Sequence, residues 1–185
     1  NVAGWTADAE SDGNVAVAVS NHAPLGAGVI NIDKAGGGSL SLTRSTVTGN
    51  SGPAMAGVWS PTPTTIVDSD IRGNTVTGPD PPRVTGAVAV DSSLTMTGST
   101  VSANTISPSG AAVPSAAVLA RTATLENDTI SGNTADVGGL YAREAGTLRH
   151  VTMADNVGPV ARHVAASGPV SFAAMALSSP PTASD

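Results

Sequence analysis

The 185-residue chain is long enough for one domain with its own core, and its 40% hydrophobic but only 2% aromatic residues, rich in alanine, valine, serine and threonine, favour an all-β protein. A net charge of −6 with only eight Lys and Arg argues against nucleic acid and anionic membrane surfaces as partners. The lack of cysteine excludes disulfides, thiolate catalysis and cysteine-bound zinc, and no apolar run reaches the ~20 residues of a membrane span.

Residues 1–27 fit the repeat of the following chain poorly and are predicted to form an irregular N-terminal coil or cap. Within them Asp8, Glu10 and Asp12 have the opening spacing of a calcium-binding loop. The twelfth position of such a loop should be a bidentate Glu, but here it is Val19, the last of several alternating valines that indicate a strand. A solvated acidic turn is therefore the favoured interpretation, weak Ca²⁺ binding is the alternative, and no other cofactor is expected.

From residue 28 to residue 178 a pattern recurs every 23–30 residues. Each repeat has an asparagine, an apolar residue three positions before it and another eight positions before it, with mostly Thr, Ser or Asp beside the first of these. This alternation is typical of strands with one buried face. The asparagines are Asn50, Asn74, Asn104, Asn133 and Asn156. The apolar residues three positions earlier are Val47, Ile71, Val101, Ile130 and Met153, and those eight positions earlier are Leu42, Ile66, Met96, Leu125 and Leu148.

A third apolar segment, which begins with a small residue, follows each asparagine from Asn50 to Asn133, and a similar segment precedes Asn50. These segments start at Gly28, Gly57, Gly86, Ala117 and Gly139. In this alignment Trp59, Val88 and Tyr141 share one column of core or core-edge residues. Three short strands per coil, joined by turns instead of hairpins, predict a parallel β-helix of about five to six coils. Asn suits a tight turn, and stacked amides can hydrogen-bond along the axis, so the asparagines are expected to form a structural ladder.

Charged residues offer a check on this register. Glu126 in one coil is succeeded by Arg149 in the next, and Arg121 is succeeded by Glu144. Opposite charges on adjacent rungs are what correct stacking predicts.

Two adjacent coils carry longer loops, which are rich in proline. One contains Asp80 and Arg83, and the other contains Ser109. Because loops on a rigid scaffold often bind partners, they are the candidate site for a protein or glycan, although surface decoration is the favoured interpretation. Residues 179–185 are predicted to be a Pro/Ser-rich tail or linker.

Asp68, Asp70 and Arg72 alternate along one predicted strand and form the only weak candidate for a catalytic site. The neighbouring rung offers Thr100 and Ser102 but no second set of carboxylates, so a local ion pair between Asp70 and Arg72 is favoured over chemistry. The chain has no metalloprotease, phosphate-loop or serine-nucleophile motif, and its three histidines follow no ligand spacing.

The pattern apolar-x-x-Asn followed by Gly-apolar-apolar resembles the repeats of polymorphic outer-membrane-protein passengers. More broadly it resembles the pectate-lyase-like β-helix of many bacterial surface proteins. The resemblance covers roughly residues 28 to 160, with Val, Ile or Met where that family favours Phe. It implies a single-stranded right-handed parallel β-helix, a solenoid. Lyases of this fold gather carboxylates and a basic residue on one outer face, which is the role the resemblance implies for Asp68, Asp70 and Arg72.

An intact structural repeat without a complete catalytic set predicts a non-catalytic structural or adhesive segment of a secreted or cell-surface bacterial protein. The start at Asn1 favours a processed piece of a longer protein. The expected partners are a protein or glycan at a cell surface, or further copies joined through the ends of the solenoid, with neither nucleic acid nor membrane insertion. The alternatives are a polysaccharide-binding or polysaccharide-degrading β-helix, and a self-assembling fibre subunit.

Overall fold

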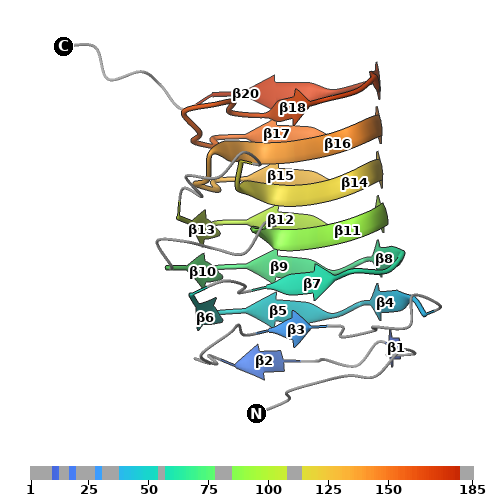
Figure 1. The fold of residues 1–185 in the computed structure, drawn as a ribbon, viewed down its shortest axis with the longest axis vertical. Coiled ribbons are helices and arrows are strands. Elements are labelled where there is room, and N and C mark those ends of the chain that lie inside the picture. Colours follow the sequence, from blue (N-terminus) through green and yellow to red (C-terminus); the bar gives the residue numbers. More distant parts are fainter. Residues whose placement is uncertain are drawn as a thin grey trace.

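The computed structural model describes residues 10–12, 17–19, 28–30, 38–53, 57–77, 85–107 and 114–179. The secondary-structure elements within these ranges are all β-strands, and every strand pairing is parallel. The strands lie in three sheets, which Figure 1 shows as a stack of rungs along one axis. The prediction of an all-β chain with parallel, stacked strands is confirmed.

The ten-stranded sheet contains β1 (Glu10–Asp12), β3 (Val29–Ile30), β4 (Leu40–Thr43), β7 (Val58–Ser60), β8 (Thr64–Val67), β11 (Gly86–Thr97), β14 (Ala116–Glu126), β16 (Val137–Arg149), β18 (Val164–Ala166) and β19 (Val170–Ala173). The seven-stranded sheet contains β2 (Val17–Val19), β5 (Thr46–Thr48), β9 (Asp70–Arg72), β12 (Thr100–Ser102), β15 (Thr129–Ser131), β17 (Thr152–Ala154) and β20 (Ala176–Ser178). The three-stranded sheet contains β6 (Ser51–Gly52), β10 (Thr75–Val76) and β13 (Thr105–Ile106).

The chain visits the sheets in the same order on successive rungs. From β4 it passes through β5 and β6, returns to the first sheet as β7 and β8, and then continues into β9 and β10. In β11, β14 and β16 the two segments of the first sheet join into one long strand with a register shift inside it. This path is compatible with a β-helix. Strands β1 and β2 lie within the segment 1–27, and they pair in parallel with β4 and β5.

The two apolar columns predicted from the repeat are present as stacked partners. Val47, Ile71, Val101, Ile130 and Met153 align along the seven-stranded sheet. Leu42, Ile66, Met96, Leu125 and Leu148 align along the ten-stranded sheet. All ten are at most 1% exposed and belong to one core cluster, so side chains from both sheets fill the space between them. Burial of alternate residues on each strand is what fixes this register, because a slip of one residue would turn every core side chain outward.

The third predicted column is wrong by one residue at its middle rung. Val88 pairs with Val58 in the core, whereas Trp59 pairs with Ala89. The sequence alignment matched Gly57 with Gly86, but the inward-facing valines decide the register instead. Trp59 and Tyr141 consequently lie on the face of the sheet away from the main core. They pack there, partly buried, against a second apolar cluster that consists of Ala89, Ala116, Leu119 and Val137.

Residues in the left-handed backbone region lie before and after five strands of the seven-stranded sheet, β5, β9, β12, β15 and β17, and another lies before β20. The column before the strands consists of Arg44, Asp68, Gly98, Asn127, His150 and Ala174, with φ between 48° and 62°. The column after them consists of Gly49, Gly73, Ala103, Gly132 and Asp155, with φ between 51° and 65°. These turns let the chain change direction at each corner while the strands stay in register.

Candidate functional site

The predicted site residues fall into three groups. Asp8, Asp80, Arg83 and Ser109 lie outside the described residues. Glu10 and Asp12 are described by their backbone alone, and that backbone forms strand β1, where the sequence had suggested an acidic turn. Asp68, Asp70 and Arg72, together with the five asparagines, are described in full.

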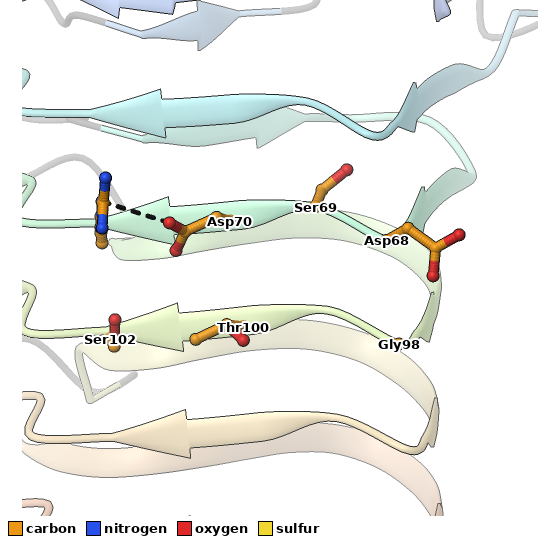
Figure 2. A pocket seen from close by; sticks show the side chains of 7 residues that line it. Asp68, Ser69, Asp70, Gly98, Thr100 and Ser102 are labelled. Carbon is orange, nitrogen blue, oxygen red and sulfur yellow. Dashed lines mark ion pairs between the residues drawn. The ribbon is translucent and has the colours of Figure 1, made fainter. Parts of the chain in front are cut away.

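Asp68, Asp70 and Arg72 line a hollow of about 370 Å³ on the outer surface of the seven-stranded sheet. Strand β9 projects Asp70 and Arg72 outward on either side of the buried Ile71. The adjacent rung supplies the facing residues, since Asp70 pairs with Thr100 and Arg72 with Ser102. Figure 2 shows Asp68 at the opposite end of the hollow from the ion pair. The sequence register therefore placed these side chains together correctly.

Ion pairing and a missing side chain shape this hollow. The Nε atom of Arg72 lies 3.1 Å from Oδ2 of Asp70, and their side chains are 58% and 34% exposed (Figure 2). The surface pair expected from the sequence is thus present, and at such exposure it contributes only ~0–1 kcal/mol. Gly98 lies beside Asp68, and a Cβ added there would come within 2.5 Å of Asp68 Oδ1. Glycine at position 98 therefore leaves the room that the Asp68 carboxylate occupies.

The chemistry that this hollow can support is hydrogen bonding to a polar ligand. It offers two carboxylates, one guanidinium and three hydroxyl groups, but no histidine. Within the described ranges, no group of three or more His, Cys, Asp or Glu side chains could hold a metal ion. Its one cation is already paired with one of its two carboxylates. The residues that line it include no histidine to act as a proton-transfer group and no partner that would activate a serine nucleophile.

The five asparagines form the predicted ladder inside the molecule. From Asn50 onward each Nδ2 donates to Oδ1 of the next asparagine, at 2.9, 3.0, 2.9 and 3.1 Å. Each of these Oδ1 atoms also accepts the backbone N–H of the preceding asparagine. From Asn74 onward each Nδ2 also donates to a main-chain carbonyl of the preceding rung, such as Val47 O for Asn74. All five side chains are at most 1% exposed.

A second polar ladder, which the sequence analysis missed, runs along the corner before the seven-stranded sheet. The backbone N–H of Ser45 donates to Oγ of Ser69, that of Ser69 to Oγ of Ser99, and that of Ser99 to Oδ1 of Asp128. The signal was available, because these four residues occupy the first position of successive repeats. The next residue in that position is the buried Val151, which ends the ladder.

Asp128 is the one acidic residue of this ladder, and it is 1% exposed. Its carboxylate accepts the backbone N–H groups of Ser99 at 2.7 Å and Glu126 at 3.0 Å. Burial raises its pKa from 3.8 to about 6, although these two hydrogen bonds oppose the rise. The carboxylate is thus held by the backbone inside a corner, away from the surface hollow, and it stabilises the turn.

Four charged residues gather where the long strands of the first sheet shift register. Arg143 Nη2 lies 2.6 Å from Asp91 Oδ1 and reaches across an intervening rung. Arg121 Nε lies 3.8 Å from Glu144 Oε1, which confirms one of the two charge pairings predicted from the repeat. For the other, Glu126 and Arg149 are confirmed as register partners on adjacent strands.

Searches with protein-family models, against curated proteins and against solved structures gave no match to this chain. In the part of the chain that the structure describes, no helix is long and apolar enough to cross a membrane.

Proposed function

We propose that this chain is a non-catalytic structural or adhesive segment of a secreted or cell-surface bacterial protein. The observation that carries the proposal is the uninterrupted ladder from Asn50 to Asn156, because it commits the same buried position on five successive rungs to backbone support. The surface hollow adds to it, since its single cation is neutralised locally. A rigid rod of stacked rungs suits a spacer that presents a surface at a distance.

In finer detail, we propose that the stack is a single-stranded right-handed parallel β-helix of the pectate-lyase-like kind. The recurring apolar-x-x-Asn pattern and its likeness to polymorphic outer-membrane-protein repeats support this. The same likeness supports an extracellular or cell-surface location.

Incubation of the purified chain with acidic and neutral polysaccharides, with and without Ca²⁺, tests the structural role. We expect no chain cleavage. Cleavage that disappears in Asp70→Ala, but persists in the control Asp155→Ala on a distant rung, would overturn the proposal and make the chain a lyase or hydrolase. Asp155 suits the control because it is exposed and takes no part in the hollow.

Glycan binding without cleavage is the second candidate function, and the hollow beside Asp68 is the observation that favours it. Carboxylates and hydroxyls can exchange hydrogen bonds with a hydroxyl-rich ligand, and Arg72 is exposed enough to contact it. Calorimetric titration of the same polysaccharides should then show binding that Arg72→Ala weakens. Equal binding by wild type and Arg72→Ala would exclude the hollow and direct attention to the loops with Asp80, Arg83 and Ser109.

A further inference from the structure

The last rung of the stack presents core-column side chains to solvent. Phe172 of β19 pairs with Leu148, and Leu177 of β20 pairs with Met153. Leu148 and Met153 are completely buried, whereas Phe172 and Leu177 are 55% and 57% exposed. Both residues thus continue the columns of the core, but no rung among the described residues covers them.

The edge strands at this end lack the usual protection against pairing. Strands β18, β19 and β20 read VAA, VSFA and ALS, with no charged residue and no proline. Exposed sheet edges in natural proteins are commonly blunted by lysine, proline or inward-facing charges, because their free N–H and C=O groups pair readily with another strand. This end therefore combines an unprotected backbone edge with exposed apolar side chains.

At the opposite end of the stack, the matching edges have no partner strand among the described residues. Strands β1, β2 and β3 pair with β4, β5 and β7, and no described strand pairs with their other edges. Following the register through the stack, β1 lies in the column of β19, β2 in that of β20 and β3 in that of β18. Figure 1 shows the two sets of strands at the two ends of the rod.

We infer that a second copy of this chain stacks its first rung on this last rung, with β1, β2 and β3 of one copy beside β19, β20 and β18 of the other. Every pairing within the stack is parallel, so a head-to-tail contact prolongs all three columns, whereas a head-to-head contact cannot keep all three parallel. In this register Ser11 and Ala18 occupy the columns of Phe172 and Leu177. Small residues at one end thus correspond to the two large exposed residues at the other.

Such a contact does not close on itself, because each copy keeps one free end of each kind, so copies add in a line. The inference deepens the proposed structural role and rests on it. It names the partner of the stack as the stack itself, and it supplies the length that a spacer or fibre needs.

Engineered cysteines test the direction of the contact, and the chain has no cysteine of its own to interfere. Glu10 and Ser171 occupy the same column at opposite ends. Neighbouring parallel strands bring such positions within disulfide reach. Under mild oxidation, a mixture of the Glu10→Cys and Ser171→Cys chains should form a disulfide dimer that neither chain forms alone. A dimer formed by the Ser171→Cys chain alone would show a head-to-head contact and overturn the inference.

Sedimentation of the unaltered chain at rising micromolar concentration tests whether the contact forms. We expect the average mass to rise, and Leu177→Asp to keep the chain monomeric. The control Ser178→Asp adds the same charge at the outward-facing neighbour and should still assemble. Circular dichroism checks that both variants fold. A monomer at every concentration would overturn the inference and leave a continuing chain or another protein as the cover of this end. Polysaccharide cleavage is read separately, so failure of assembly and failure of the structural role remain distinguishable.

Discussion

The substitution Asn104→Ala measures how much the buried asparagine ladder contributes to stability. Its side chain accepts the backbone N–H and Nδ2 of Asn74 at 2.9 and 3.0 Å, and donates to Ile71 O at 3.0 Å and Asn133 Oδ1 at 2.9 Å. Truncation removes all four hydrogen bonds in a fully buried corner. At about 1 kcal/mol net for each bond, and with the Asn74 N–H left without its acceptor, the free energy of unfolding should fall by about 4 kcal/mol.

The same substitution at the end of the ladder is the matched control. Among the described residues, the side chain of Asn50 makes one hydrogen bond, from Nδ2 to Asn74 Oδ1, and its own Oδ1 has no partner. Asn50→Ala should therefore cost only about 1 kcal/mol. The difference between the free energies of unfolding of the two variants gives the contribution of the ladder hydrogen bonds, because both variants lose one asparagine.

Urea unfolding followed by circular dichroism gives both free energies. Because stacked repeats can unfold in parts, hydrogen exchange at the Asn74 amide provides a local reading that does not need a two-state transition. Asn104→Ala should strongly accelerate exchange of that amide. A cost for Asn104→Ala no larger than that for Asn50→Ala, with the Asn74 amide still protected, would refute the reasoning.

Three further tests concern the close approach of rungs, the buried carboxyl group of Asp128 and the ion pairs at the register shift. Gly57→Ala would press a Cβ into the Ala87 carbonyl of the next rung, so it should lower the free energy of unfolding in urea by several kcal/mol. A Cβ at Gly132 meets no atom closer than 3.9 Å, so Gly132→Ala should cost only about 1 kcal/mol, for its left-handed backbone. Equal costs for the two variants would contradict this. The raised pKa of Asp128 lets the folded chain hold a proton that the unfolded chain releases. Lowering the pH from about 7 to about 4 should therefore stabilise the wild type by about 2 kcal/mol relative to Asp128→Ser. Parallel pH profiles of stability for the two chains would contradict this. Asp91→Ala leaves Arg143 without its ion-pair partner and should destabilise the fold more than Arg121→Ala. The pair of Arg121 with Glu144 is longer and more exposed, so its loss should cost only ~0–1 kcal/mol in thermal melts.

Side-chain alternation made most of the fold predictable. The columns through Val101 and Met96 could be read from the sequence, because a strand with one buried face alternates whether or not its neighbours are known. The asparagine ladder was predictable for the same reason, since one residue type recurs at one position. The error at Val88 arose where two glycines suggested an alignment that the inward-facing valines overrule.

Other features could not be read from residue types. The left-handed column before the seven-stranded sheet includes Arg44, Asn127 and Ala174, which share no property except the backbone angle that the corner imposes. The residues around the hollow were predictable, but its shape was not. The shape depends on the position of the Asp68 carboxylate, which occupies the room that a side chain at Gly98 would fill. The pair between Asp91 and Arg143 skips a rung, and it forms only because the register shift places both residues at one corner.

The contacts that hold neighbouring rungs together do not require a covalent connection between those rungs. Each rung recognises the next through parallel backbone edges, a shared core column and the asparagine ladder, and the partners are 23 to 30 residues apart in sequence. The chain between them sets their effective concentration but makes none of these contacts. Within the chain, the last rung covers Leu148 and Met153. A rung from a second molecule can cover Phe172 and Leu177 in the same way, at the additional entropic cost of bringing two molecules together. Assembly should consequently depend on concentration and on these two residues, whereas the stability of each copy should depend on its internal ladders.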